Sequence, residues 1–145
     1  MGNLLIKGGM VWRHDSFKAN EDLVYELPDE HDMSVRLSDE DLIVPGLIDF
    51  HVHLWAPPAV STFGIAAEKH YAEGIVGGLD AGTYGINDWE EANRYWQNAS
   101  GFKVKSFVNL LPEGLTVFPP TEPTKPEDIS VDDYVSFVNQ NKGDL

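Results

Sequence analysis

The sequence has 145 residues, 42% of them hydrophobic, which is enough for one ordinary domain with a hydrophobic core and argues against disorder. Ten basic and twenty-four acidic residues give a net charge of -14, which argues against binding to nucleic acids or anionic membranes. Cysteine is absent, so a bound metal would need nitrogen and oxygen ligands. Since neither a basic leader with an apolar run nor an apolar stretch of about 18 residues occurs, we expect a cytoplasmic location.

The first part of the chain carries the signals of short β-strands. Residues 4–12 mix large apolar side chains around a pair of glycines, which favours a strand and a turn over a helix. The stretch that follows is polar and rich in acidic residues, with small apolar groups only at 23–25 and 35–37. We expect short, partly exposed strands there, and we interpret residues 1–41 as an N-terminal β segment.

An abrupt change to apolar residues marks the start of a second region, residues 42–145. Its first segment, residues 42–55, contains a Pro-Gly break and then a strongly apolar run, which predicts the first core strand. Successive side chains of a strand point to opposite faces. The prediction therefore places Ile48, Phe50, Val52 and Leu54 on an apolar face, and Asp49, His51, His53 and Trp55 on a polar face.

Helices and strands are predicted to alternate through the rest of this region. Gly74 is placed to end one helix, Asn87 with Glu90 three positions later is placed to cap a second, and Ser130 is placed to cap a third. Such an order calls for a parallel sheet with helical crossovers. The predicted elements are a helix at 63–73, a strand at 75–79, a helix from 87 to 101, a strand at 103–111, a proline-rich loop at 112–126 and a helix from 130 onward.

His51 and His53 are the leading candidates for a functional site. Two histidines separated by one residue on a strand project from the same side, so both imidazoles can bind one cation at about 2.0–2.1 Å. Neutral imidazole binds zinc, iron, manganese and related ions without adding charge. On spacing alone, a coincidental pair on a surface strand is the more common outcome. The interpretation therefore depends on the surrounding residues.

Those residues resemble a known signature. Residues 44–53, Val-Pro-Gly-Leu-Ile-Asp-Phe-His-Val-His, match the Pro-Gly-hydrophobic-Ile-Asp-x-His-x-His segment on the first barrel strand of the amidohydrolase superfamily. Residues 77–83 and 107–110 resemble the second and third strands, and residues 4–9 resemble the start of the small β-sandwich that precedes the barrel. Within the superfamily, the sequence is most similar to the dihydroorotase-like and deacetylase branch.

This resemblance implies an α/β fold: a partial TIM-type (β/α) barrel over residues 42–145, comprising the first three of eight strand-helix units, after an incomplete β-sandwich over residues 1–41. It also implies that His51 and His53 bind a divalent metal, usually zinc, in a site that holds one or two ions in the complete enzyme. The metal would activate a water that hydrolyses an amide, cyclic amide or ester bond of a small-molecule substrate. The family's other metal ligands lie on later strands, so we expect the 145-residue chain alone to be inactive.

Four other polar residues are candidates for binding substrate or for supporting the metal ligands. Asp80 and Thr83 lie near the end of the second predicted strand and Asn109 near the end of the third, and barrel enzymes build their sites at this end. Asp49 shares the predicted histidine face and could hydrogen-bond a metal-bound imidazole. A turn-forming or strand-capping role accounts equally well for each of the four.

Two functions from different classes fit the sequence. In the first, the chain is the N-terminal portion of a metal-dependent amidohydrolase. In the second, it is a non-catalytic module derived from such an enzyme, and a partner covers the open sheet edge near the third strand. A coincidental histidine pair in an acidic α/β domain is a third interpretation, which leaves the motif unexplained. Because three strands cannot close a barrel, we expect marginal stability and association into a homo-oligomer or with a complementing chain.

Overall fold

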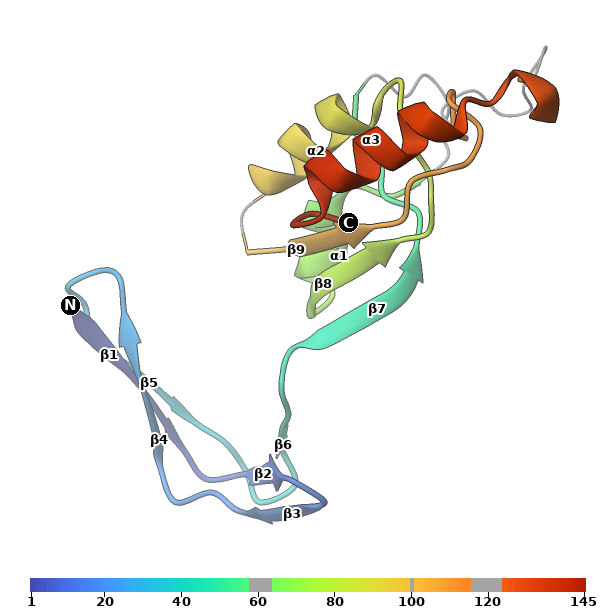
Figure 1. Cartoon of the computed structure of the whole chain (residues 1–145). Coiled ribbons are helices and arrows are strands. Elements are labelled where there is room, and N and C mark those ends of the chain that lie inside the picture. The colour runs from blue at the N-terminus through green and yellow to red at the C-terminus, as the bar shows by residue number, and fades with distance from the viewer. Residues whose placement is uncertain (58–63, 100, 116–123) are drawn as a thin grey trace. The chain divides into compact units, whose positions relative to one another are not determined.

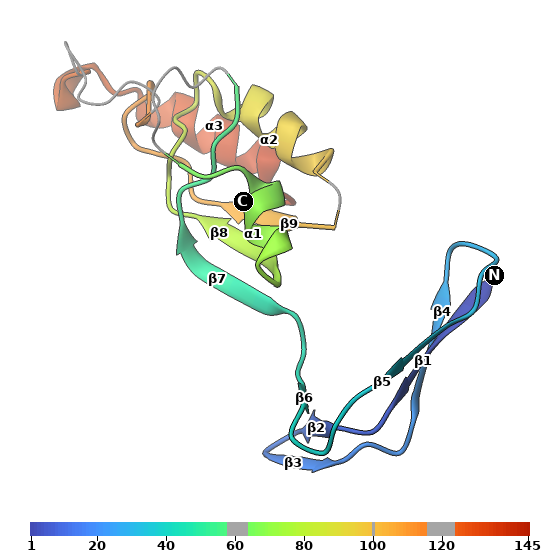
Figure 2. The same ribbon diagram turned by 180° about the vertical axis from the view of Figure 1, so that it is seen from behind.

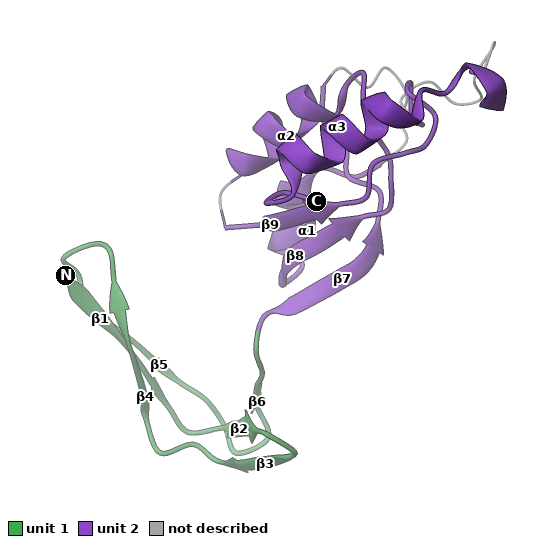
Figure 3. Cartoon of the chain, viewed as in Figure 1, with its two compact units in different colours: residues 1–45 green, residues 46–145 purple. Residues whose placement is uncertain are grey.

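The structure of the chain, a computed structural model, describes residues 1–57, 64–99, 101–115 and 124–145. It divides into two compact units, Met1–Pro45 and Gly46–Leu145 (Figure 3). The predicted helix start at Phe63 and residues 116–123 of the predicted proline-rich loop lie outside the described residues. No helix in the described ranges is long and apolar enough to cross a membrane.

Unit 1 consists of six short strands: β1 (Gly2–Lys7), β2 (Met10–Arg13), β3 (Ser16–Ala19), β4 (Leu23–Leu27), β5 (Met33–Arg36) and β6 (Leu42–Ile43). They form two sheets with the orders β4-β1-β5 and β3-β2-β6. Gly8 and Gly9 connect β1 with β2 at φ values of 78° and 76°, a left-handed conformation that glycine adopts without strain. The two strands predicted in the acid-rich stretch are present as β4 and β5, whereas the largely polar β3 was not predicted.

Unit 2 combines a three-stranded sheet with helices: β7 (Leu47–Val52), α1 (Ala67–Ala72), β8 (Ile75–Asp80), α2 (Trp89–Gln97), β9 (Lys103–Ser106), the 3-10 helix η1 (Pro126–Asp128) and α3 (Val131–Asn141). The strands are parallel in the order β7-β8-β9, so a helix-containing crossover joins each pair (Figure 1; Figure 2). The predicted α/β class and parallel pairing are confirmed. The apolar segment predicted as one strand over 42–55 is divided, because β6 pairs with β2 in unit 1 and a separate strand, β7, begins the sheet of unit 2.

The helices of unit 2 pack on one face of its sheet. Val52, Asp80 and Ser106 are paired across the three strands, so their side chains share this face. The Ser106 hydroxyl accepts a hydrogen bond of 2.7 Å from the Trp89 indole of α2. The opposite face is not covered by the described helices, and Lys105 lies exposed on it beside β8. The buried core comprises Val52, Leu54, Ala56, Ala67, Tyr84, Trp89, Ala92, Trp96 and Phe102.

Local signals account for two of the three predicted helix ends. Gly74 follows α1 at a φ of 87°, and the Ser130 hydroxyl accepts a hydrogen bond from the Asp133 amide at the start of α3. The predicted cap at Asn87 is wrong: α2 is preceded by Asp88, and no side-chain hydrogen bond caps it. The reason is a turn at residues 86–88, in which the amides of Asp88 and Trp89 both donate to the Gly85 carbonyl, so the helix begins one residue later than expected.

Candidate functional site

The predicted site residues of unit 2 gather near the carboxyl ends of its parallel strands. His51 is the next-to-last residue of β7, and His53 follows the end of that strand. Asp80 ends β8, Thr83 comes three residues later, and Asn109 follows β9. Loop residues after parallel strands project at one edge of a sheet, which is where α/β proteins place most of their ligands. The structure therefore brings candidates from three separate segments to one edge.

The two histidine rings lie edge to face at the end of β7. Their centres lie 5.7 Å apart, with the planes at 85°. His51 is exposed and His53 is half-buried. The pairing of β7 with β8 is irregular between Asp49 and Val52, where two residues of β7, Phe50 and His51, lie opposite one residue of β8, Leu79. This bulge breaks the strict alternation that was predicted for the strand.

As a result, the four residues predicted to share an apolar face of this strand are not all buried. Val52 and Leu54 are buried in the core, whereas Ile48 and Phe50 are 56% and 75% exposed. Asp49, predicted to support a histidine ring, instead accepts a hydrogen bond of 3.0 Å from the backbone amide of His51. That contact is the one expected of a strand-capping side chain.

Asp80 and Thr83 form the buried part of the site. The Thr83 amide and hydroxyl each donate 2.7 Å hydrogen bonds to the Asp80 carboxylate, which also accepts one of 2.8 Å from the Leu54 amide. Thr83 Oγ1 lies 2.9 Å from Nδ1 of His53. Burial raises the pKa of Asp80, while these hydrogen bonds and the charge of His53 oppose that shift. The two residues thus connect the β8 end to the histidine pair.

Asn109 holds the neighbouring loops together. Its side-chain amide donates a 2.7 Å hydrogen bond to the Gly82 carbonyl, and its side-chain oxygen accepts one of 2.9 Å from the Leu111 amide. Its backbone amide donates to the Tyr84 carbonyl at 2.8 Å. These contacts fit the turn-forming role that the sequence left open for Asn109.

Tyr84 is a residue of this region that sequence reasoning did not identify as part of the site. Its buried hydroxyl accepts a 2.6 Å hydrogen bond from the Ala56 amide and donates one of 2.7 Å to the Ala56 carbonyl. Burial raises the pKa of its phenol, so the group stays protonated at neutral pH and can make both bonds. Tyr84 thereby fixes the segment that follows the histidines. In the sequence, the signal that could have identified Tyr84 was its position next to Thr83, a predicted site residue.

A metal ion at this edge would find two imidazole donors. Within the described residues, no three side chains of His, Cys, Asp or Glu gather closely enough to hold an ion. Two neutral imidazoles suit zinc and related ions, but structural and catalytic zinc sites use at least three protein ligands. His51 and His53 therefore fit part of a metal site, and further ligands would have to come from outside the described residues.

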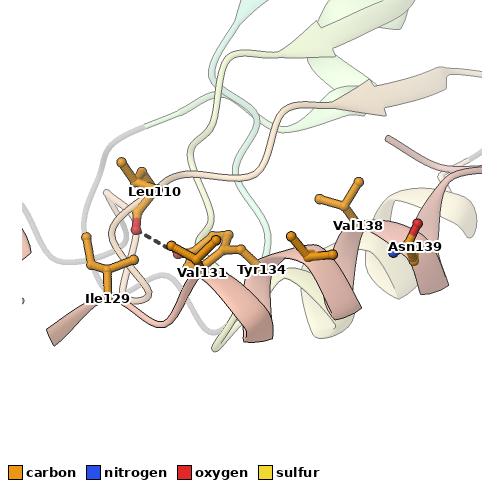
Figure 4. A pocket seen from close by; sticks show the side chains of 7 residues that line it. Leu110, Ile129, Val131, Tyr134, Val138 and Asn139 are labelled. Carbon is orange, nitrogen blue, oxygen red and sulfur yellow. Dashed lines mark hydrogen bonds between the residues drawn. The ribbon is translucent and has the colours of Figure 1, made fainter.

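Neither of two hollows in unit 2 is lined by His51 or His53. One, with a volume of about 500 Å³, includes Ile48, Phe50 and Leu79. The other, of about 320 Å³, runs along α3 and is lined by apolar side chains such as Val131 and Val138 (Figure 4). Tyr134 donates a 2.8 Å hydrogen bond to the Leu110 carbonyl at one end of the second hollow.

Comparison with solved structures identifies the fold. A crystal structure of a dihydroorotase matches with a TM-score of 0.80 and 21% sequence identity, over 99% of this chain and 41% of that chain. A crystal structure of an adenine deaminase matches with a TM-score of 0.68 and 17% identity, over 98% of this chain and 39% of that chain. The chain thus spans about two-fifths of either enzyme, and the expected likeness to dihydroorotases is confirmed for the fold. No protein-family model and no curated protein matches the sequence.

Proposed function

We propose that this chain is the N-terminal portion of a metal-dependent amidohydrolase that hydrolyses an amide, cyclic amide or ester bond of a small molecule. The observation that carries the proposal is the position of His51 and His53. Their rings meet at the carboxyl edge of a parallel sheet whose fold matches a dihydroorotase. The same two residues complete the Pro-Gly-hydrophobic-Ile-Asp-x-His-x-His motif.

The proposal includes the architecture of the whole enzyme. The order β7-α1-β8-α2-β9-α3 has parallel strands with helices on one face, as the first three units of a (β/α)8 barrel would. In such a barrel, the uncovered sheet face would line the interior. Unit 1 would be the incomplete β-sandwich segment that precedes the barrel. The proposed division thus falls near residue 42, where the sequence changes character.

Within the proposed site, His51 and His53 would hold the ion, for which zinc is the best match to two nitrogen donors. When bound, such an ion acts as a Lewis acid on the substrate carbonyl and makes water a stronger nucleophile. The chain's own contribution is to position the ligands: Thr83 hydrogen-bonds the His53 ring, and Tyr84 fixes the segment that follows it. The remaining ligands and the catalytic acid or base would come from outside the described residues.

The test is zinc binding by the purified chain, measured by titration against a chromophoric chelator at neutral pH. We expect detectable binding by the wild-type chain, weaker than that of a complete site because two ligands leave the ion under-coordinated. Replacing either histidine, by H51A or H53A, should weaken binding at least tenfold. The control is H31A, which removes an exposed histidine of unit 1 and should leave binding unchanged.

Equal zinc binding by the wild-type chain and the H51A/H53A double variant would refute the proposal, since the ion would then be bound elsewhere. The alternative function, a non-catalytic module that works with a partner chain, is favoured by the exposed Phe50 and Ile48 beside the uncovered sheet face. It predicts a defined oligomer by light scattering and binding of zinc without hydrolysis. A monomer with a sharp two-state melt would argue against this alternative.

A further inference from the structure

A buried chain of hydrogen bonds ends on His53. Asp80 and Thr83 are 1% and 0% exposed, so water does not compete for their contacts. Thr83 Oγ1 lies 2.7 Å from Asp80 Oδ2 and 2.9 Å from His53 Nδ1, and it is the bridge between them. His53 and Thr83 are separated by 30 residues, and the sheet brings them together.

The positions of the hydrogens in this chain follow from counting donors. Two of the three groups that contact the Asp80 carboxyl, the amides of Leu54 and Thr83, can give hydrogens but cannot receive them, and the third is the Thr83 hydroxyl. A carboxylate is the acceptor that such a setting favours, so the single hydroxyl hydrogen of Thr83 points to Asp80. Thr83 Oγ1 can then only accept from His53. The hydrogen of the neutral imidazole must therefore be on Nδ1.

We propose that Thr83 is a positioning residue that, through Asp80, holds His53 as the Nδ1–H tautomer and turns its Nε2 atom toward the metal. The assignment of the tautomer depends only on the hydrogen bonds just described, whereas its role toward a metal rests on the proposed function. Neutral imidazole binds a metal through the nitrogen that lacks a hydrogen. A partner on the other ring nitrogen fixes the tautomer and the ring orientation, as in many metal sites.

The reverse arrangement makes a distinct prediction. If Asp80 carried the proton, it would donate to Thr83, and Thr83 would donate to His53 Nδ1. His53 would then carry its hydrogen on Nε2 and would be unable to bind a metal through that atom. The two arrangements therefore differ in which ring nitrogen of His53 is protonated, and this difference is observable without any metal.

The experiment is two-dimensional ¹⁵N–¹H NMR of the histidine rings of the metal-free chain at about pH 8, where a histidine with an ordinary pKa is neutral. The His53 signals are assigned by their loss in H53A. We expect the pattern of a protonated Nδ1 and an unprotonated Nε2. An Nε2–H pattern in the wild-type chain would overturn the inference, whatever the zinc measurements show.

Two substitutions test whether Thr83 is the cause. T83V keeps the shape of the side chain but removes the hydroxyl, so His53 should lose its preference for the Nδ1–H tautomer. T83S keeps the hydroxyl and should retain the Nδ1–H pattern. An unchanged His53 pattern in folded T83V would overturn the inference. If T83V does not fold, the comparison of wild type with T83S still decides it, because loss of the pattern in folded T83S contradicts a role for the hydroxyl.

Zinc affinity supplies the second readout. Loss of a partner that orients a ligand weakens metal binding about 10–100-fold, so T83V should bind zinc that much more weakly and T83S nearly as well as wild type. Equal affinities of folded T83V and wild type would overturn the positioning role. An Nδ1–H tautomer in a wild-type chain that binds no zinc would instead refute the proposed metal function while supporting the tautomer assignment. The two proposals therefore fail in different measurements.

Discussion

The two units of the chain differ in how much side-chain surface they bury. Unit 2 contains the buried cluster around Trp89, Trp96 and Tyr84, all nearly inaccessible to solvent. In unit 1, all of whose residues the structure describes, Val11 is the only buried hydrophobic side chain. Even the aromatic pair of unit 1, Trp12 and Phe17, is partly exposed at 40% and 36%. Backbone pairing between strands therefore contributes more to the stability of unit 1, and side-chain packing contributes more to the stability of unit 2.

This difference bears on where a site can be built. A metal or catalytic site needs side chains held in fixed positions, and buried packing provides that rigidity. The candidate residues His53, Asp80 and Thr83 all belong to unit 2 and adjoin its core. Small sheets with exposed side chains open more readily than a packed core. We therefore expect substitutions in the core of unit 2 to have the larger effects.

The largest effect is expected from W89A. Trp89 is 1% exposed, packs edge-on against Phe137 with ring centres 5.3 Å apart, and donates its indole hydrogen to Ser106. Its removal should lower the free energy of unfolding by about 3–5 kcal/mol, as measured by urea denaturation. In unit 1, V11A truncates a buried side chain that is smaller than Trp89, and it should cost about 1–2 kcal/mol. Equal losses of unfolding free energy in W89A and V11A would contradict the difference in packing between the units.

An intermediate effect is expected from Y84F, which removes one oxygen atom. The backbone amide and carbonyl of Ala56, which are buried, then lose their hydrogen-bond partner. The free energy of unfolding, measured by thermal or urea denaturation, should fall by about 1–3 kcal/mol. In unit 1, Tyr25 is 51% exposed, so Y25F serves as the control and should change stability little. A neutral Y84F would mean that the segment after the histidines is held by other contacts.

The smallest effect concerns pH. Hydrogen bonds from the amide and hydroxyl of Thr124 lower the pKa of Glu113 below its ordinary value of 4.5. A lowered folded-state pKa means that Glu113 adds stability above about pH 4.5 and that this contribution is lost as the pH falls through the folded-state pKa. We expect E113Q to flatten the pH dependence of stability in that acid range, measured by denaturation from pH 6 to 3. An unchanged curve would show that this loop contact adds nothing to the stability of unit 2.

The sequence was a good guide where the signal is local. Ser130 caps α3 and Gly74 follows α1 as predicted, because these effects depend on a few neighbouring residues. The parallel order of the strands was predictable because apolar runs alternate with helical segments. The motif at 44–53 indicated a dihydroorotase-like fold, which the structural comparison supports.

Tertiary contacts decided the rest. The bulge between Asp49 and Val52 exposes Phe50, although strict alternation predicted it to be buried. Asn87 does not cap α2, because it lies in a turn closed on the Gly85 carbonyl, and its backbone amide donates to Pro112 in the loop after β9. Both outcomes depend on which distant strand or loop lies alongside, and local sequence carries no information on that.

By itself, then, the sequence determined the candidate ligands His51 and His53, the α/β class and the approximate places of the other polar candidates. Only the tertiary structure joined Asp80, Thr83 and His53 into one hydrogen-bonded chain and set Tyr84 against Ala56. The physical reason is that residue type and spacing fix what a side chain can donate or accept. Which residue it bonds to depends on the packing of strands and helices. His53 and Thr83 are 30 residues apart in the sequence, and Ala56 and Tyr84 are 28 apart.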